Sequence, residues 1–583
     1  MPRCFWLYRT GEYSSDRQAV VSNFALPIAS FSRPHNYKPT FIIFIASMPW
    51  KSRWNIPIPT QSLPSYLFDS PTVSLDDKPL LIDAEFPEYY LAQHTYREWS
   101  KRFALGLQQN GFKPGDRLLL YSGNTIFFPV ILLGTIMAGG IFTGANPTYV
   151  ARELAYQLKD SGATFLITSE SSLKTALDAA DSIGFPKGKV YVSDAGFSTL
   201  EGKPQSSVQG IAHFSNLFAP SASSFRWPEF TTQDQMNTTC VLNYSSGTTG
   251  VPKGVEITHR NYIANCAQTE YMSSLAPDYE SLVKQARGLS FLPMYHAYGQ
   301  THHCVSSAKK GIPVYVMRKF EFVELLRCIE RYRITSLTLV PPIAVALTKR
   351  PEVKDFDISS VTSAGCGAAP LGRESAEDFD RTVAKGAWQL RQGWGMTEIT
   401  CSAIGFDPTS SFVSGAVGEL NPNIEGRIVD EDGKEVGLEE RGEFWVRGPN
   451  VMKGRDKDGL IYIVDRKKEL IKVKGNQVAP AELESLLLDH PAVQDAAVVG
   501  VVINGEELPR AYVAIQPTHA QTFATKELAS WLAERVAPHK RLAGGVVVTE
   551  AIPKNPSGKI LRKVLRERAK EEVGDKEVRG SRL

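Results

Sequence analysis

The sequence predicts an α/β protein: a large N-terminal domain of helix-covered sheets with a small β portion, followed by a small α/β C-terminal domain. At 583 residues, 43% of them hydrophobic, the chain is too long for one core and should divide into domains. From Thr95 onward, helical patterns alternate with short apolar runs, which is typical of βαβ units and a mostly parallel sheet. Between Gly418 and Gly448 the expected strands are closely spaced, which indicates an antiparallel portion.

The periodicity of the sequence locates individual elements in both domains. In the N-terminal domain we expect helices over 96–110 and 151–161 and strands over 117–121, 164–168 and 239–243. In the C-terminal domain we expect helices over 480–488 and 525–536 and a strand over 511–516. Residues 206–234 are rich in Ser, Pro and Phe without a period, so we expect a long surface connection there.

Composition places the domain boundaries. Residues 1–47 are rich in Ser, Pro and aromatic residues without periodicity, and we expect them to be disordered or a spurious extension. They lack the order of a secretory signal, and Glu12 and Asp16 argue against a mitochondrial transit peptide. The N-terminal domain should then span 48–464 and the C-terminal domain 465–583.

The charge balance gives no reason to expect a polyanionic partner. The chain has 65 basic and 62 acidic residues, a net charge of +3, so we expect small-molecule partners and no nucleic acid. Its seven cysteines are scattered without a CxxC pair, and this odd number suits a reducing compartment better than a disulfide framework.

Two apolar stretches need to be weighed as membrane segments. Residues 41–48 are too few to cross a bilayer, and residues 127–145 are uncharged but contain glycines and have polar flanks. We expect the second stretch to be a buried helix rather than a spanning one, and no transmembrane segment.

The C-terminal tripeptide Ser581, Arg582, Leu583 is a conservative variant of SKL, which a peroxisomal import receptor binds at an exposed C-terminus. The preceding residues are charged and should leave it accessible, so we expect a peroxisomal protein with the import receptor as a partner. The alternative is a chance match, in which case we expect a cytoplasmic location.

The segment YSSGTTGVPKG, residues 244–254, follows an expected strand and is rich in glycine and hydroxyl groups. In a Walker A loop a glycine precedes the lysine and Ser or Thr follows it. Here Lys253 precedes Gly254 and Val255 comes next, so a kinase-type loop is disfavoured. Backbone N–H groups and hydroxyls can still converge on phosphate oxygens in such a loop, although a simple Gly/Ser turn is the alternative.

Further segments follow this loop in a defined order. They are LPMYHAYG (292–299), GAAPLG (367–372), QGWGMTE (392–398), GEFWVRGP (442–449), VDRKKELIKVKGNQVAPAELE (464–484) and PKNPSGKILRK (553–563). Together with the loop they resemble the adenylate-forming enzymes, and the resemblance extends from Met48 to the C-terminus. The segment KELIKVKGNQVAPAELE is most similar to the 4-coumarate:CoA ligase branch and its fungal peroxisomal acyl-CoA ligases.

The resemblance implies an AMP-forming acyl-CoA synthetase, an acid–thiol ligase that uses ATP, Mg²⁺ and coenzyme A. A carboxylate and ATP give acyl-AMP and pyrophosphate, and the CoA thiol then gives the thioester. The implied pocket has small and aromatic residues and no basic residue directed to a second carboxylate, so we expect an apolar aliphatic or aryl acid. A role in secondary metabolism or β-oxidation is suggested only by the resemblance and the C-terminal tripeptide.

The resemblance also assigns the nucleotide site. The phosphates would lie in the loop, Lys253 would be a mobile counter-charge, Thr397 would bond the α-phosphate, and Glu398 would hold Mg²⁺, a hard cation suited to a carboxylate. Adenine would lie between 367–369 and Trp394, Arg466 would contact the ribose side, and Lys559 would bridge the substrate carboxylate and the α-phosphate. The loop residues are Ser245, Ser246, Gly247, Thr248, Thr249 and Gly250, and the adenine segment is Gly367, Ala368 and Ala369.

Two further groups follow from the same resemblance. The acid pocket would be formed by His296, at its mouth, with Ala297, Tyr298, Gly365, Cys366 and Met396. Asp465 would be the hinge of a mobile C-terminal domain, which withdraws Lys559 after the first half-reaction and presents Lys472, Lys474, Gly475 and Gln477 to CoA. Taken singly, Trp394 could instead be a core residue, Lys559 a solvated lysine, Glu398 a helix-start carboxylate and His296 a loop histidine.

One expected motif is missing. Relatives carry a TGD motif, whose aspartate binds both ribose hydroxyls, in the region that here reads VMKGRDKDGLIYIVDRKK, residues 451–468. Asp456 and Asp458 match the turn after that motif and do not replace it. A gene-model error, a degenerate nucleotide- or acyl-binding paralogue, and a working enzyme with an altered site all remain open. An adenylation enzyme with a non-CoA acceptor and a luciferase-like oxygenase are further alternatives on the same scaffold.

Overall fold

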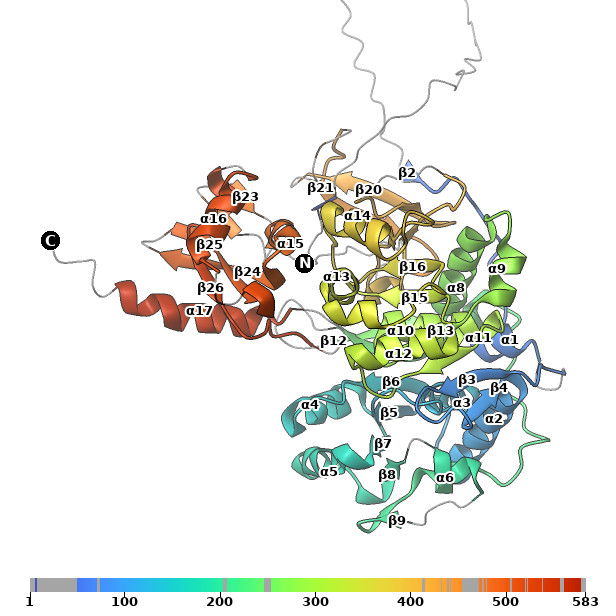
Figure 1. The fold of residues 1–583 in the computed structure, drawn as a ribbon. Helices are drawn as coiled ribbons and strands as arrows, with labels where there is room; N and C mark the ends of the chain where they lie inside the picture. Colours follow the sequence, from blue (N-terminus) through green and yellow to red (C-terminus); the bar gives the residue numbers. More distant parts are fainter. Residues whose placement is uncertain are drawn as a thin grey trace, which may run out of the picture.

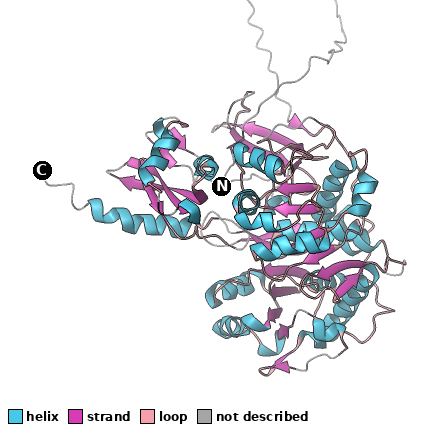
Figure 2. Cartoon of the chain, in the orientation of Figure 1, coloured by secondary structure: helices cyan, strands magenta, loops and turns pink. Residues whose placement is uncertain are grey.

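The computed structural model describes residues 6–7, 50–70, 74–194, 196–202, 207–245, 253–410, 415–430, 433–437, 440, 442–452, 471–473, 476–478, 480–503, 506–519, 521, 523–536, 538–555 and 560–577. The chain forms a large N-terminal domain built around stacked sheets, with a small C-terminal domain beside it (Figure 1). Helices cover the sheets of both domains (Figure 2), so the α/β architecture expected from the sequence is confirmed.

The first large sheet has six strands in the order β12-β11-β6-β5-β7-β8. Its neighbours are parallel except for β12, which runs back along β11 as a hairpin. The strands are β5 (Arg117–Tyr121), β6 (Ile141–Ala145), β7 (Phe165–Ser169), β8 (Val190–Ser193), β11 (Thr239–Ser245) and β12 (Lys253–Thr258).

Successive side chains along these strands point to opposite faces of the sheet and pack into two separate hydrophobic cores. Leu119 and Leu166 pack with α4 (Ala151–Ser161) and α5 (Leu173–Ser182) on one face. Leu118 and Ile167 belong to the core on the other face, which contains α2 (Gln93–Gln109), α3 (Phe128–Met137) and α8 (His259–Ser274). The glycine-rich segment therefore connects two strands at the edge of a sheet whose faces are both covered.

The second large sheet has seven strands in the order β17-β16-β15-β13-β14-β3-β4 and is parallel except for β4. The strands are β3 (Pro79–Asp83), β4 (Tyr90–Ala92), β13 (Gly288–Ser290), β14 (Val314–Val316), β15 (Ser336–Leu339), β16 (Ser363–Cys366) and β17 (Arg391–Gln392). One face of this sheet packs against three helices to form a further hydrophobic core. They are α12 (Phe322–Tyr332), α13 (Pro341–Lys349) and α14 (Arg373–Thr382). The carboxyl ends of β15, β16 and β17 lie at one edge of this sheet, which is where open α/β sheets bind ligands.

The remaining N-terminal elements include the expected antiparallel portion. A four-stranded sheet has the order β1-β21-β20-β2, and its pairs are all antiparallel. Its strands, and those of the small pairs, are β1 (Trp6–Leu7), β2 (Trp50–Lys51), β20 (Glu425–Val429), β21 (Gly442–Arg447), β9 (Ser207–Val208), β10 (Ile211–Ala212), β18 (Ile404–Gly405) and β19 (Glu419–Leu420).

Short helices complete this domain. They are α1 (Leu63–Phe68), α6 (Phe197–Leu200), α7 (Gln233–Met236), α9 (Tyr279–Gln285), α10 (Ala297–Gly299), α11 (Ser307–Lys309), the 3₁₀ segments η1 (Glu170–Ser172), η2 (Lys187–Lys189), η3 (Phe214–Leu217), η5 (Pro351–Asp355) and η6 (Thr397–Ile399), and the π-helix η4 (Gln300–Ser306).

The C-terminal domain has a three-stranded sheet, β24-β25-β26, with α15 and α16 on one face and α17 on the other. Arg562, at the start of α17, is anchored in the domain by a buried ion pair with Glu484 of α15, in which Nη2 lies 2.7 Å from Oε2. The elements are β22 (Ile471–Val473), β23 (Asn476–Val478), α15 (Pro480–Asp489), β24 (Val493–Ile503), β25 (Glu506–Ile515), η7 (Pro517–His519), α16 (Thr525–Ala533), η8 (Pro538–Lys540), β26 (Val546–Val548) and α17 (Arg562–Glu577).

Two expectations from the sequence are corrected. The apolar stretch 127–145 is not one helix: α3 ends at Met137, and β6 begins at Ile141 in the middle of the six-stranded sheet. Residues 206–234 are not a surface connection throughout, because Phe214, Leu217 and Trp227 are buried in the core beside α2. No helix in the described ranges is long and apolar enough to span a bilayer.

Polar contacts join the two domains. Lys349, the last residue of α13, donates from Nζ to the carbonyl oxygens of Leu488, His490 and Val493 at 2.6, 3.3 and 3.3 Å. Ser375 of α14 donates to Oδ1 of Asp489 at 2.9 Å. The C-terminal end of α15 therefore docks against the helices of the seven-stranded sheet.

Candidate active site

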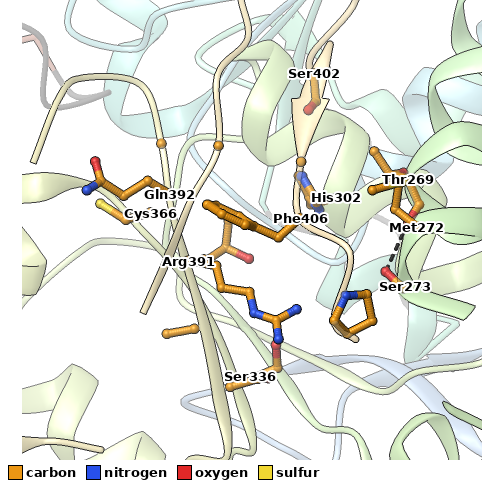
Figure 3. Close-up of a pocket in the computed structure, with 18 of the residues that line it drawn as sticks. Thr269, Met272, Ser273, His302, Ser336, Cys366, Arg391, Gln392, Ser402 and Phe406 are labelled. Carbon is orange, nitrogen blue, oxygen red and sulfur yellow. Dashed lines mark hydrogen bonds between the residues drawn. The ribbon is translucent and has the colours of Figure 1, made fainter. Parts of the chain in front are cut away.

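A cleft of about 1570 Å³ runs along β15, β16 and β17, from their first residues to the segments that follow their carboxyl ends. Residues of α8 and α9 line one side, and residues of the loop after β17 line the other. Figure 3 shows Met272 of α8, Arg391 of β17 and Phe406 of the following loop around this space. The position follows from topology, because three adjacent parallel strands end together at this edge.

The cleft brings together many of the residues singled out in the sequence. Those that line it are His296, Ala297, Tyr298, Gly365, Cys366, Gly367, Ala368, Trp394, Met396 and Thr397. Ala369, Lys253 and Glu398 are described but are not among the lining residues. Outside the described residues lie Ser246, Gly247, Thr248, Thr249, Gly250, Asp465, Arg466, Lys474, Gly475, Lys559 and the tripeptide Ser581, Arg582, Leu583.

The strands on either side of the glycine-rich loop are described. Ser245 is the last residue of β11 and is paired with Lys253, the first residue of β12. Lys253 is exposed to solvent. Lys472 and Gln477 are paired across the β22–β23 hairpin of the C-terminal domain.

The ring of His296 is held by the start of α10. Its Nδ1 accepts a hydrogen bond from the backbone N–H of Tyr298 at 3.3 Å, so a neutral ring carries its proton on Nε2. The Tyr298 ring packs over Gly367, where a Cβ would lie 3.4 Å from Cζ. These contacts place an imidazole donor and an aromatic ring beside the segment expected to bind adenine.

The loop after β17 is fixed by a buried asparagine, Asn450. Asn450, which is fully buried, donates from Nδ2 to the carbonyl oxygens of Ile399 and Ser402 at 3.1 and 3.0 Å. The backbone carbonyl oxygen of Asn450 accepts a hydrogen bond from Thr400 Oγ1 at 2.7 Å. Trp394, at the other end of the loop, contacts Phe444 edge-on with ring centroids 5.2 Å apart, so the indole has a defined position at the cleft. Sequence reasoning did not identify Asn450.

A second buried network connects β11, which leads into the glycine-rich segment, to the wall of the cleft. Gln300 Oε1 accepts from Asn243 Nδ2 at 3.2 Å and from the Tyr262 hydroxyl at 2.6 Å. All three residues are buried, and they come from β11, α8 and η4. Because unpaired polar groups are costly in such a position, this network fixes β11 relative to the cleft wall.

The cleft also has basic residues that the sequence analysis did not identify. Arg391, Lys310, His302 and His303 line it. Burial lowers the pKa of His302 to about 4 and that of His303 to about 3, so both rings are neutral at pH 7. Burial also lowers the pKa of Lys310, while Glu270 opposes that effect. The described part of the cleft therefore contains basic side chains, whereas the sequence analysis expected no basic residue directed to a second carboxylate.

The described part of the chain contains no cluster of side chains that could form a resident metal centre. No group of three or more His, Cys, Asp or Glu side chains is placed to hold an ion there. A single carboxylate such as that of Glu398 suits a magnesium ion that arrives with phosphate oxygens, because Mg²⁺ is commonly held by one or two carboxylates and by substrate phosphates.

Comparisons with known proteins agree with this architecture. Residues 74–454 match the family model described as AMP-binding enzyme, and residues 482–559 match the AMP-binding enzyme C-terminal domain. The chain is 34% identical over 552 residues to the phenylacetyl-CoA ligase epaB of Aspergillus niger, covering 89% of this chain and 99% of that protein. It is 35% identical over 489 residues to the peroxisomal OPC-8:0-CoA ligase 1 of Arabidopsis thaliana, covering 79% and 85%.

A solved structure shows the same fold. The anthranilate CoA ligase AuaEII, in complex with anthranoyl-AMP, superposes with a TM-score of 0.74 at 20% identity, covering 89% of this chain and 99% of that one. The family models together match most of the sequence, and the two curated relatives are aligned over 99% and 85% of their length. The chain therefore belongs to the AMP-binding, adenylate-forming enzyme family and is one of its AMP-forming acid–thiol ligases.

Proposed function

We propose that the protein activates a carboxylic acid with an aliphatic or aryl body, first as its acyl-AMP and then as its CoA thioester. The observation that carries this proposal is the cleft, which places Thr397, Trp394, His296 and the segment 365–368 around one volume of about 1570 Å³. That volume exceeds a typical single-ligand pocket and suits a nucleotide and an acid together.

Each group in the cleft has a task in this reaction. Trp394 and the backbone of 367–369, of which Gly367 and Ala368 line the cleft, would hold adenine, and the Thr397 hydroxyl would bond the α-phosphate. His296, with its proton on Nε2, would donate toward the acid at the pocket mouth. The carboxylate oxygen attacks the α-phosphorus, the bond to the β-phosphate oxygen breaks, and pyrophosphate leaves.

The attack joins two anions, so cationic charge is needed at that point. Lys559, contributed by the C-terminal domain, would bridge the carboxylate and the α-phosphate. Mg²⁺, held by the phosphates and Glu398, would supply further charge neutralisation. In the second half-reaction the CoA thiolate attacks the acyl carbon and AMP leaves, with Lys472, Lys474, Gly475 and Gln477 turned to CoA about the Asp465 hinge.

ATP–pyrophosphate exchange over a panel of carboxylic acids tests this proposal, followed by thioester formation with CoA. We expect exchange that depends on the acid, and loss of it in the Lys559→Ala variant by at least about 100-fold. Exchange without any acid, or an unaffected Lys559→Ala variant, would contradict the proposal.

A second candidate is a nucleotide- or acyl-binding protein with impaired chemistry. It is favoured by one observation, the absence of a TGD motif between Met452 and Asp465. Calorimetric binding of ATP without exchange would support it. Recovery of exchange after insertion of a relative's TGD segment would instead indicate a damaged gene model.

We further propose that the protein acts in the peroxisome and contributes to secondary metabolism. The tripeptide Ser581, Arg582, Leu583 and the similarity to a ligase named as peroxisomal support the location. The role in secondary metabolism is suggested only by the resemblance to fungal acyl-CoA ligases. A fluorescent protein fused to the N-terminus should accumulate in peroxisomes. It should become cytoplasmic when the tripeptide is deleted, and an unchanged distribution would refute the assignment.

A further inference from the structure

We infer that the acid carries a second carboxylate at its far end, bound by the guanidinium of Arg391 and the hydroxyls of Ser336 and Thr338. This inference rests on the proposed function, because it names the substrate class of the same cleft. The three side chains are called the distal subsite below.

Strand alternation brings the distal subsite together. Ser336 and Thr338 are two residues apart on β15, so both side chains point to the cleft, while Leu337 and Leu339 between and beyond them are buried in the core. On β16 and β17, Gly365 is in register with Thr338 on one side and with Arg391 on the other. The cleft face of these three neighbouring strands is therefore polar, which is unexpected for a pocket that holds only an apolar acid.

Gly365 leaves room for the arginine side chain. A Cβ at this position would meet nothing nearer than the Arg391 carbonyl oxygen at 4.0 Å, so the space above β16 is open. Arg391 extends into that space toward Ser336, and Gln392 points to the opposite side (Figure 3). The guanidinium thus lies over the strand that separates β17 from β15.

The distal subsite has unused hydrogen-bonding capacity. Within the described ranges, neither the guanidinium of Arg391 nor the hydroxyls of Ser336 and Thr338 hydrogen-bond to another protein group, and Arg391 forms no ion pair. Burial lowers the pKa of Arg391, and Asp407 acts against this effect. Asp407 is already bound by Arg53 at 2.6 Å and is therefore not the missing partner.

A carboxylate matches these donors. A guanidinium presents a planar fork that binds both oxygens of a carboxylate, and two hydroxyl donors can share the remaining lone pairs. A half-buried cation without a counter-ion is unfavourable, and an anionic ligand removes that cost. Met272 and Phe406 stand among the other lining residues and can contact an apolar body between the two acidic ends (Figure 3).

The position of the subsite fits the far end of the acid. The carboxyl ends of β16 and β17 lead into the adenine segment at Gly367 and the loop to Thr397. Arg391 and Gly365 precede those ends, and Ser336 lies three residues before the end of β15, about 10 Å along the strand. An acid whose reacting carboxylate meets the nucleotide therefore extends toward Arg391.

Thioester formation with paired acids tests the inference. Each pair contains a monocarboxylic acid and its counterpart with a carboxylate at the other end, such as octanoate with suberate and phenylacetate with 4-carboxyphenylacetate. We expect the wild type to have the higher kcat/KM for at least one dicarboxylate, and Arg391→Met to lower the dicarboxylate-to-monocarboxylate ratio by about 10- to 100-fold, with the KM for ATP unchanged. Arg391→Lys, which keeps the charge but loses the fork, should lose less.

Arg381→Met is the matched control. Arg381 also lines the cleft, but its side chain is 74% exposed and forms an ion pair with Asp378, so the ratio should not change. If Arg391→Met does not fold, Thr338→Val with Ser336→Ala should lower the same ratio. Preference for the monocarboxylic acid in every pair, or an unchanged ratio in the variants, overturns this inference but leaves the proposed function intact. Failure to use any acid overturns the proposed function and this inference with it.

Discussion

Gly395 occupies a position in the cleft loop that does not admit a side chain. A Cβ there would overlap the backbone carbonyl oxygen of Cys401, which is main chain and not the end of a flexible side chain. At Gly188, by contrast, a Cβ would meet nothing within 4 Å. The glycine at 395 is thus required by packing, and this requirement applies to the same loop that carries Thr397.

The Gly395→Ala variant should therefore be impaired in both stability and turnover. The overlap is with backbone and should cost about 1–3 kcal/mol, as overpacking commonly does. We expect a lower melting temperature and a raised KM for ATP. Gly188→Ala is the control and should resemble the wild type, and equal behaviour of the two variants would show that the loop tolerates the side chain.

Several elements could be predicted from sequence because their pattern is local. The strand over 117–121 and the helix over 151–161 agree with β5 and α4, since each has a clear period. The stretch 127–145 could not be divided correctly, because a uniformly apolar run has no period that separates a buried helix from a buried strand. Arg391 was missed for another reason: its significance depends on Gly365 and on the register with β15, which no local pattern encodes.

Asn450 provides a test of how the cleft loop is held. Asn450→Ala removes the donations to Ile399 and Ser402 and should cost about 1–3 kcal/mol, with a raised KM for ATP because Thr397 lies in the same loop. Asn110→Ala is the matched control, since Asn110 also donates to a carbonyl oxygen, that of Gly106, on α2. A stability loss in both variants with no change of KM in either would mean that Asn450 does not position the loop.

At the scale of the whole molecule, the contact between the two domains includes a carboxyl group with a perturbed pKa. Burial raises the pKa of Asp489 to about 6, with Glu374 adding to the effect and Ser375 and Lys349 opposing it. Asp489 keeps its proton more readily in the docked arrangement than in water. Docking is therefore favoured at low pH and weakens as the pH rises from about 4 through 6, by at most about 3 kcal/mol.

Asp489→Asn should remove that dependence, because an amide does not ionise. Small-angle X-ray scattering from pH 4 to 7 should show the wild type expanding as the pH rises, while Asp489→Asn stays compact. His490 also titrates near this contact, and burial lowers its pKa, so the difference between variant and wild type is the informative quantity. Identical profiles for the two proteins would rule out Asp489 as the cause.

Lys349→Met tests the same interface from the other domain. It removes three donations to the carbonyl oxygens at the end of α15, which should weaken docking by about 1–3 kcal/mol and increase the radius of gyration at neutral pH. Lys174→Met, which removes an exposed lysine paired with Asp178, should leave the radius unchanged. A compact Lys349→Met variant would mean that other contacts hold the domains together.

The central claim is that the acid is activated as an acyl-AMP, and the fate of the carboxylate oxygen tests it most directly. The acid that supports exchange is labelled with ¹⁸O in its carboxylate and converted to the CoA thioester, and the products are analysed by mass spectrometry. If the carboxylate attacks the α-phosphorus and AMP is later displaced by the thiol, one ¹⁸O must appear in AMP. Label in inorganic phosphate, accompanied by ADP, would instead show an acyl phosphate and contradict the account.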